Sequence, residues 1–484
     1  MPIKTKFDLL KDRRTKIIAT LGPASESDEN IANLLDSGAD LVRLNMSHGN
    51  YQTHQVAYQR VRDYAEKINT PVAILADLCG PKIRTGQFKD SSIHLDTGNR
   101  VTVTVRDVIG EPGLIPSQYE ALAKDVQPGD RILLADGVME LRVEDIQDSE
   151  VFCRIIHGGI LGDFKGINLP GVNVSTPALT EKDRLDARFA LELGVDFLAL
   201  SFVRRASDML ELRSLIEEVG REAGIIAKIE KPEALENGGE ILDASDGIMI
   251  ARGDLGVELD PEDVPVAQHQ LIHRARAVNK PIIVATQMLE SMMENPRPTR
   301  AEVTDISYAV SSGADAVMLS GETAAGAFPI KAVEMMARIV RQTEAYAWTR
   351  NETGESGRVM NPDQPVLYGD ALAQATAKLT FDLPATAIVV VSQSGMSATT
   401  VSAARPGAPV IALTSSAQMC RRMNLLWGVI PILTEEAGSI NPNQITRQIV
   451  KELKLAEPGQ FILLVRGFSN DPLMNTPSVT VIQI

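Results

Sequence analysis

The segment GIIAKIEKPEALENGGEILDASDGIMIARGDLG, residues 224–256, indicates the fold class most clearly. It holds two short apolar runs, GIIAKIE and DGIMIARGDLG, separated by a helix-like segment. Short apolar, β-branched runs bounded by turn residues are typical of buried strands. A strand, a helix and a further strand in succession predict a parallel sheet that is covered by helices.

The same alternation extends on both sides of this stretch. It begins at Thr15 and resumes at Leu179 after an interruption. The eight apolar runs are TKIIATLG (Thr15–Gly22), ADLVRLNMSH (Ala39–His48), PVAILADL (Pro71–Leu78), VDFLALSFV, GIIAKIE, DGIMIARGDLG, KPIIVATQML and ADAVMLSGE. A helix-like stretch follows each of them. Eight such units are what a closed (β/α)8 TIM barrel requires.

Two other regions of the chain have a different pattern. Between Lys82 and Pro177 the sequence is strand-like throughout and is punctuated by turn signals such as Asp136-Gly137. Residues 344–365 are polar and read as an irregular boundary, and a smaller set of strand and helix runs follows. The expected architecture is therefore α/β: a barrel formed by residues 1–80 and 178–348, an inserted all-β lid of residues 81–177, and a C-terminal α/β domain of residues 349–484.

Composition excludes several classes of function. The formal net charge of −15 argues against a nucleic-acid-binding surface. The three cysteines lie far apart, with neither a disulfide framework nor zinc-ligand spacing, which suits a reducing cytoplasm. We find neither a signal-peptide core at the start nor an apolar run long enough to span a bilayer, so we expect no membrane partner.

Polar residues gather at the C-terminal ends of the predicted barrel strands. In TIM barrels, strand ends and βα loops converge at this face and build the active site. Any one of these residues alone could be a solvated strand end, but the set predicts an active site. The residues are Arg43, Asn45, Ser47, Asp77, Lys228, Glu230, Asp254, Thr286, Ser320 and Glu322.

Lys228 and Glu230 are the most informative pair. A spacing of two residues on a strand points both side chains to the same face. The simplest interpretation is an ion pair. The alternative is that Glu230 and Asp254 bind a divalent metal while Lys228 faces a phosphoryl group, since Mg2+ takes one or two carboxylates and completes its shell with substrate oxygens and water. The histidines are not spaced for a zinc site.

Seven strings of the chain closely resemble pyruvate kinase. They are RLNMSHG, DLCGPKIRTG, KGINLPG, AKIEKPEAL, ARGDLGVEL, ATQMLESM with NPRPTRAEVTD, and MLSGETAAG. The resemblance runs in order over essentially the whole chain. It implies the final step of glycolysis, in which phosphoenolpyruvate and ADP give pyruvate and ATP, and a homotetramer.

The resemblance also implies roles for individual residues. Lys228 would stabilise the transferring phosphoryl group, and Arg43 would hold the phosphate of phosphoenolpyruvate. Glu230 and Asp254 would bind Mg2+ (or Mn2+). The backbone of Gly253 and Asp254, with the Thr286 hydroxyl, would hold the carboxylate and enolate region of the substrate. Asn45, Arg84 and Lys165 would meet the nucleotide phosphates. Phosphoryl transfer depends on positioning the reactants and on neutralising the charge of the phosphoryl group.

One departure from the family pattern concerns potassium. Members that resemble the K+-dependent group have Glu where this chain has Lys82, and Thr where it has Leu78. The other residues of the ion cage, Asn45, Ser47 and Asp77, are present. A fixed ammonium can replace a monovalent cation electrostatically, so we expect K+ not to be required. The alternative is that Lys82 only points into solvent at the domain hinge.

A second departure lies in the C-terminal domain. The segment Ser392, Gln393, Ser394, Gly395, Met396 and Ser397 resembles the effector loop of the family. Hydroxyls and N–H groups before a helix can bind a phosphate, although ordinary turn chemistry would also account for them. Members that bind a sugar bisphosphate have Lys at Gln393. We therefore expect a sugar monophosphate or AMP-like effector.

Three rival interpretations are weaker. A non-catalytic metabolite sensor usually loses a charged catalytic group, whereas Lys228, Glu230, Asp254 and Thr286 are all present. Phosphoenolpyruvate lyases and mutases lack a long β insertion after the third strand. A dikinase would need a phosphohistidine domain, for which the chain has no segment.

Overall fold

The computed structural model describes residues 13–349, 367–383, 385–438, 440–469 and 475–484. Its centre is a closed barrel of eight strands in the order β1-β16-β15-β14-β13-β12-β3-β2, and every pair of neighbours is parallel. This confirms the TIM barrel. The strands are β1 (Lys16–Thr20), β2 (Leu41–Asn45), β3 (Ala73–Asp77), β12 (Phe197–Leu200), β13 (Gly224–Ile229), β14 (Gly247–Ala251), β15 (Ile282–Ala285) and β16 (Ala316–Leu319).

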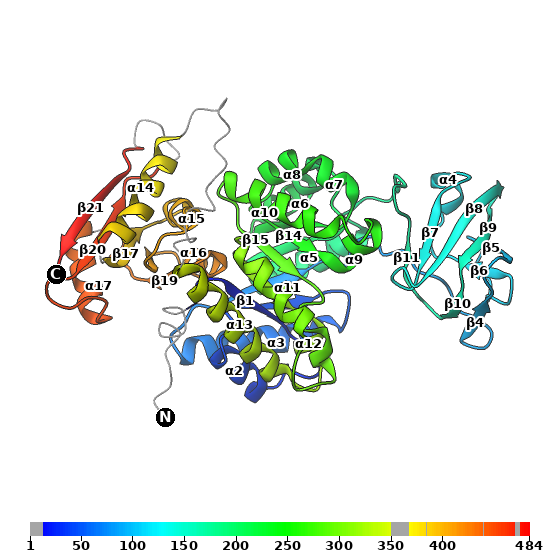
Figure 1. The fold of residues 1–484 in the computed structure, drawn as a ribbon, viewed down its shortest axis with the longest axis horizontal. Coiled ribbons are helices and arrows are strands. Elements are labelled where there is room, and N and C mark those ends of the chain that lie inside the picture. The colour runs from blue at the N-terminus through cyan, green and yellow to red at the C-terminus, as the bar shows by residue number, and fades with distance from the viewer. Residues whose placement is uncertain (1–12, 350–366, 384, 439, 470–474) are drawn as a thin grey trace.

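Helices surround the barrel, as Figure 1 shows. Several begin with a side-chain cap that satisfies free backbone N–H groups; Thr180 and Asp183, for example, form a capping box at the start of α5. The helices of the barrel are α2 (Asp28–Asp36), α3 (Tyr51–Lys67), α5 (Glu181–Leu193), α6 (Ala206–Val219), α7 (Pro232–Glu236), α8 (Gly238–Ala244), α9 (Arg252–Glu258), α10 (Val264–Ala277), η1 (Glu290–Met293), α11 (Arg300–Ser311), α12 (Gly321–Ala324) and α13 (Pro329–Thr349).

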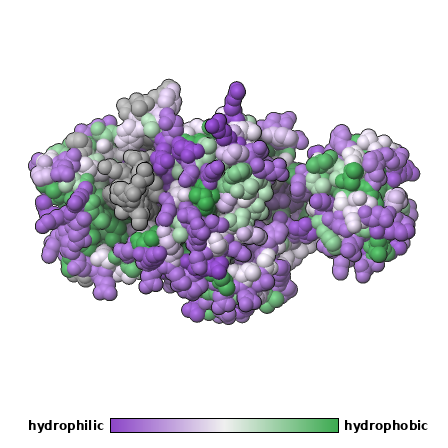
Figure 2. Space-filling model, turned by 90° about the horizontal axis from the view of Figure 1, so that it is seen from below, coloured by the Kyte–Doolittle hydropathy of each residue, from purple (hydrophilic) through white to green (hydrophobic). Residues whose placement is uncertain are grey.

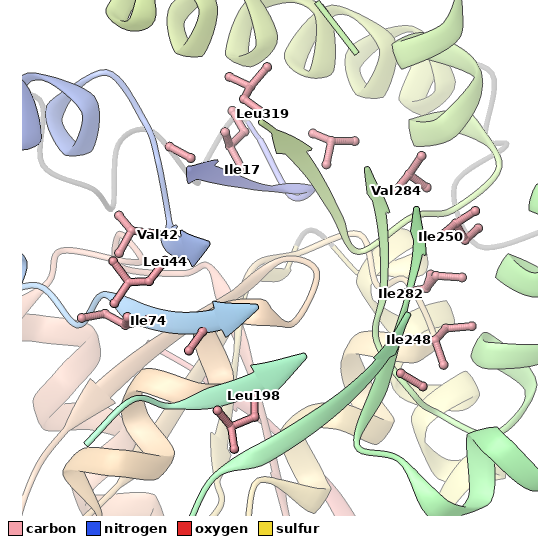
Figure 3. Packing of buried hydrophobic residues seen from close by; sticks show 14 of the residues in the cluster. Ile17, Val42, Leu44, Ile74, Leu198, Ile248, Ile250, Ile282, Val284 and Leu319 are labelled. Carbon is pink, nitrogen blue, oxygen red and sulfur yellow. The ribbon is translucent and has the colours of Figure 1, made fainter. Parts of the chain in front are cut away.

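Side chains alternate between the two surfaces of the barrel wall, as the period of two in a strand requires. Outward-facing residues such as Ile17, Ile74 and Ile248 pack between the strands and the helices (Figure 3). Their inward-facing neighbours fill the barrel, which makes it a packed core. The inner cluster comprises Ile18, Leu41, Ala73, Leu75, Phe197, Ala199, Ile226, Met249, Ile283, Ala285, Ala316, Met318 and Leu425.

The insertion after β3 is almost entirely β-structure and forms a lobe at one end of the molecule (Figure 1). It consists of a sheet of order β11-β7-β8-β9-β5-β6, a small pair β10-β4, and one short helix. A core of its own includes Val103, Leu141 and Val151. The elements are β4 (Ser92–Leu95), β5 (Arg100–Thr104), β6 (Leu114–Pro116), α4 (Leu122–Asp125), β7 (Arg131–Leu134), β8 (Met139–Gln147), β9 (Glu150–His157), β10 (Gly159–Gly162) and β11 (Ile167–Asn168).

The C-terminal domain is built on a five-stranded sheet of order β19-β18-β17-β20-β21, in which only β21 is antiparallel to its neighbour. Two separate apolar clusters cover its faces. The elements are α14 (Tyr368–Asp382), β17 (Ala385–Val391), α15 (Met396–Ala403), β18 (Val410–Thr414), α16 (Ala417–Arg422), η2 (Met423–Leu425), β19 (Val429–Leu433), α17 (Pro442–Glu452), β20 (Phe461–Arg466) and β21 (Ser478–Gln483).

The C-terminal domain closes the N-terminal mouth of the barrel, opposite the lid. Leu425 of η2 belongs to the apolar cluster inside the barrel. The ammonium of Lys16, at the start of β1, donates to the Val429 carbonyl at 2.6 Å. Both ends of the barrel are therefore covered by other segments of the chain, but only the lid end carries the polar strand termini predicted from the sequence.

One boundary prediction needs correction. Residues 344–349, expected to be irregular, continue helix α13. Glu344 has a structural role in this turn of the helix: its carboxylate accepts hydrogen bonds from the Arg14 and Thr15 backbone N–H groups, each at 2.7 Å. The rest of that segment, 350–366, lies outside the described residues.

The surface in Figure 2 is predominantly hydrophilic, with apolar residues scattered over it. Within the residues that the structure describes, every helix is too short or too polar to cross a membrane.

Candidate active site

Three charged side chains meet where β2, β3 and β13 end. The guanidinium of Arg43 lies against Asp77, with Nη2 2.6 Å and Nε 2.7 Å from Oδ2. The ammonium of Lys228 lies 3.2 Å from Asp77 Oδ1 on the other side of the same carboxylate. Asp77 therefore links the two cations.

Asp77 and Lys228 keep their charges in this arrangement. Burial alone raises the pKa of Asp77, but the charges of Lys228 and Arg43 outweigh it and hold that pKa below its usual range. Burial lowers the pKa of Lys228, but Asp77 and Glu230 more than offset this and leave it above its usual value. Lys228 is therefore a fixed positive charge and not a base.

Glu230 completes the cluster directly after β13. Its Oε1 lies 2.9 Å from Lys228 Nζ, as the spacing of two residues predicts, and its Oε2 accepts the Phe202 N–H at 2.7 Å. Burial raises the pKa of Glu230, and the charge of Asp254 adds to the shift. The two carboxylates are therefore close enough to repel each other.

The residues present fit a divalent cation. Glu230 Oε1 is buried and receives no aligned hydrogen bond, which leaves an oxygen lone pair for a metal. Asp254, in the first turn of α9, is partly exposed, and it lines the cavity between the lid and the barrel. Among the described residues there is no cluster of three His, Cys, Asp or Glu, so substrate and water oxygens would complete a shell of the Mg2+ type.

Thr286 follows β15 in a strained backbone conformation. Its φ of 68° and that of Gln287, 55°, both lie in the left-handed region that non-glycine residues seldom adopt. The Thr286 hydroxyl donates to the Ala285 carbonyl at 2.6 Å and accepts the Gly253 N–H at 2.8 Å. The Thr286 hydroxyl and the Gly253 N–H, both expected to bind the substrate, are thus hydrogen-bonded to each other.

A cavity of about 500 Å³ separates the lid from the barrel face. Lys82, Arg84 and Lys165 line it from the lid side, and Asp254 lines it from the barrel side. Arg84 is anchored by a hydrogen bond from Nη1 to the Phe164 carbonyl at 3.0 Å, whereas Lys165 is exposed. Cations of the lid therefore face a carboxylate of the barrel across a gap.

The turn after β2 carries the residues of the expected monovalent-ion cage. Asn45 Oδ1 accepts the Ser47 N–H at 3.2 Å, so these two residues form a local turn. The pKa of His48, in the same turn, is lowered by burial first and then by the charges of Lys82, Arg84 and Arg43. Lys82 is exposed but lies close enough to act on this turn.

The effector-like loop lies in the C-terminal domain, far from this cluster. Gly395 has a φ of 82° and precedes α15, so a side chain there would be strained. Ser392 is 2% exposed, and its hydroxyl has no hydrogen-bond partner among the described residues. The Gln393 amide donates to the Ala437 carbonyl at 2.7 Å and accepts the Ser415 hydroxyl at 2.9 Å. Ser394 is exposed and Ser397 is buried.

One of the expected rim residues has a structural role instead. Glu322 is fully buried, and its two oxygens accept the Leu289 N–H at 2.9 Å and the Ser320 N–H at 2.7 Å. It joins the loops after β15 and β16.

Two groups that sequence reasoning missed lie at the centre of the cluster. They are the Ser201 hydroxyl, which accepts from Lys228, and the Phe202 N–H, which donates to Glu230. Both follow β12 directly, so the rule that polar strand ends mark the site would have found Ser201.

Comparisons with known proteins agree with this geometry. Residues 12–333 match the family model for the pyruvate kinase barrel domain, and residues 370–481 match that for the pyruvate kinase alpha/beta domain. A pyruvate kinase of Agrobacterium vitis is 42% identical over 479 residues, which is 98% of this chain and 97% of that protein. One from Staphylococcus aureus is 44% identical over 423 residues, covering 87% of this chain and 72% of that protein. The crystal structure of a pyruvate kinase from Cryptosporidium parvum superimposes with a TM-score of 0.89 at 35% identity, over 98% of this chain and 97% of that one.

Proposed function

The chain belongs to the pyruvate kinase family, and from this premise we propose which of its residues perform the reaction. The enzyme transfers the phosphoryl group of phosphoenolpyruvate to ADP, giving pyruvate and ATP (EC 2.7.1.40). We propose Lys228, Arg43 and Thr286 as the catalytic residues. The observation that carries the proposal is the Arg43–Asp77–Lys228 cluster with Glu230 beside it.

Each residue contributes charge or position. The permanently protonated Lys228 would stabilise negative charge on the transferring phosphoryl group, and Arg43, held by Asp77, would bind the phosphate of phosphoenolpyruvate. Thr286, Gly253 and the Asp254 backbone would bind the carboxylate and enolate region. Asn45, Arg84 and Lys165 would meet the phosphates of ADP and ATP, with the lid closing to exclude water.

Glu230 and Asp254 would hold the divalent metal, which we take to be Mg2+ or Mn2+. When bound, such an ion neutralises charge on phosphoryl and enolate oxygens. The family generally uses a divalent metal, and the buried Glu230 oxygen supports the assignment.

Substitution of Lys228 by Met tests the proposal. We expect kcat to fall by at least about a hundredfold while phosphoenolpyruvate still binds, because the lost contact is strongest in the transition state. Pyruvate formation is measured in a coupled assay and binding by calorimetry. Turnover close to that of the wild type would reject the role given to Lys228.

K+ independence is a separate proposal. Lys82 supplies a fixed charge near the Asn45–His48 turn, and Leu78 replaces the Thr of K+-dependent relatives. We expect turnover in Na+- and K+-free buffer to equal that with K+ within about twofold. Lys82→Glu should create a K+ requirement. A strict requirement in the wild type would contradict the proposal.

Allosteric control through the loop 392–397 is also proposed. The uncharged Gln393, committed to two neighbours, offers no cation for a second phosphate. A sugar monophosphate or AMP should therefore lower the phosphoenolpyruvate concentration needed for half-maximal rate. Activation by low concentrations of fructose 1,6-bisphosphate would refute this. As in the family, we expect a cytoplasmic homotetramer, which light scattering can test.

A further inference from the structure

Ser201, immediately after β12, accepts a hydrogen bond from the ammonium of Lys228. Its side chain is 1% exposed, and its Oγ lies 2.7 Å from Lys228 Nζ. The same hydroxyl donates its only hydrogen to the Leu78 carbonyl at 2.7 Å. Because that hydrogen is committed, Ser201 can only accept from Lys228, and the direction of the bond is fixed.

The other two contacts of the ammonium are less well directed. Asp77 Oδ1 and Glu230 Oε1 lie 3.2 and 2.9 Å from Lys228 Nζ, but neither oxygen accepts an aligned hydrogen bond. These two carboxylates can accept the other ammonium hydrogens, but neither contact has the alignment of the bond to Ser201. Within the described residues, the bond to Ser201 is the aligned one.

The backbone around Ser201 is itself fixed. Phe202 adopts a φ of 55° and thereby presents its N–H to Glu230 Oε2. Gly80, in the loop after β3, packs so closely that a Cβ there would lie 2.8 Å from Ser201 Cβ and from Phe202 Cδ2. The pair Ser201–Phe202 therefore orients both members of the Lys228–Glu230 pair, one through a side chain and one through the backbone.

We propose that Ser201 is a positioning residue for phosphoryl transfer. It anchors one ammonium hydrogen of Lys228, so that the other two, which lie near Asp77 and Glu230, can be shared with phosphoryl oxygens that enter from the mouth of the barrel. Ser201 itself touches no substrate. The inference rests on the proposed role of Lys228.

The test is a comparison of Ser201→Ala with Ser245→Ala. Ser245 is equally buried, and its hydroxyl donates to the Ile241 carbonyl at 2.6 Å behind the barrel wall, so it controls for loss of a buried hydroxyl. Ser201→Ala should lower kcat roughly ten- to hundredfold, the usual worth of a hydrogen bond to a charged group. The KM for phosphoenolpyruvate should change by less than about twofold because Arg43 is untouched. Ser245→Ala should leave both constants unchanged.

Two further variants separate positioning from a structural effect. Ser201→Thr keeps the hydroxyl and should recover most of the lost kcat. Where the alanine or threonine variant has a lowered Tm, Ser201→Cys, which keeps the volume and replaces the hydroxyl by a weak acceptor, should show the same loss of kcat. In a Lys228→Met background, Ser201→Ala should have no further effect on kcat.

The outcomes are distinct. A kcat for Ser201→Ala within twofold of the wild type overturns the inference, as does an equal loss in the alanine and threonine variants at unchanged Tm. If Lys228→Met alone leaves kcat intact, the proposed role of Lys228 fails first. If Lys228→Met lowers kcat and Ser201→Ala does not, only the positioning role is lost.

Discussion

The two ends of the barrel both contain buried acids, but they use them differently. At the N-terminal mouth, four aspartates each stand directly before a strand and accept the backbone N–H of a residue in the neighbouring strand, at 2.8–2.9 Å. The pairs are Asp40 with Ile17, Asp196 with Ile74, Asp246 with Ile225 and Asp315 with Ile282.

Arginine side chains form salt bridges with each of these aspartates. Arg13 lies 2.9 Å from Asp40, and Arg213 lies 3.4 Å from Asp246. The C-terminal domain supplies Arg405, which lies 2.9 Å from Asp315. Asp196 receives two arginines, with Arg62 at a distance of 2.8 Å and Arg421 of the C-terminal domain at a distance of 2.7 Å. Backbone and guanidinium donors thus bind at least one oxygen of each of these acids, and this end joins strands and domains.

At the C-terminal mouth, two acids of the charged cluster each have one incompletely bonded oxygen. Asp77 Oδ1 and Glu230 Oε1 contact the Lys228 ammonium without an aligned hydrogen bond. Buried polar groups without such bonds cost stability, and they persist where a ligand can complete them. The same chemical group therefore stabilises one end of the barrel and keeps an oxygen available to cations at the other.

The largest expected effect is that of Asp77→Asn at the catalytic end. An amide cannot attract both cations, so Arg43 and Lys228 should lose their common anchor. We expect kcat to fall by about a hundredfold or more, measured with the coupled pyruvate assay. Activity within a few-fold of the wild type would show that the link between the two cations is dispensable.

Asp196→Asn at the opposite end should act on stability. The change places an NH2 group among the Ile74 N–H, Arg62 and Arg421 donors, and should lower the free energy of unfolding by roughly 2–4 kcal/mol. The kcat of the folded enzyme should be unchanged. Urea unfolding measures the first quantity. Asp63→Asn, on the exposed face of α3, is the control and should change stability by less than about 0.5 kcal/mol. A large loss of kcat in Asp196→Asn would contradict the view that acids at the N-terminal mouth serve stability and not catalysis.

Glu322→Gln tests whether an acid contributes to catalysis or to stability because of its position in the barrel or because of its hydrogen bonds. Glu322 lies at the catalytic end but is bonded like the N-terminal aspartates. We expect a loss of about 1–3 kcal/mol in unfolding free energy with kcat altered only a few-fold. If the variant is fully stable but inactive, the place of an acid at the catalytic end determines its role, and the hydrogen bonds to its carboxylate do not.

The smallest expected effect is on the pKa of His48. Lys82 contributes to the lowered pKa of that imidazole, so Lys82→Glu should raise it, because removing a nearby cation favours the protonated form. The shift is measured by NMR titration of the histidine ring protons, with Lys89→Glu as an exposed control. An unshifted His48 would place Lys82 too far away to act on this turn.

Much of this could be predicted from the sequence. The eight apolar runs correspond to the eight barrel strands, and Lys228 and Glu230 contact each other as their spacing requires. Glu322 lies at the predicted end of the barrel, but its structural role was not predicted because its burial depends on the loop after β15 folding over it. Ser201 was overlooked although it follows the same strand-end rule.

The sequence predicts the strands, the polar residues at their C-terminal ends and the set of charged residues, because periodicity and strand direction are local properties of the chain. The pairing of each acid with its cation depends instead on the tertiary structure. Asp77, Ser201 and Lys228 come from three different strands or the loops that follow them, and barrel closure alone brings β3, β12 and β13 side by side. Contacts between residues so distant in the chain depend on which strands pair, and barrel closure sets that pairing.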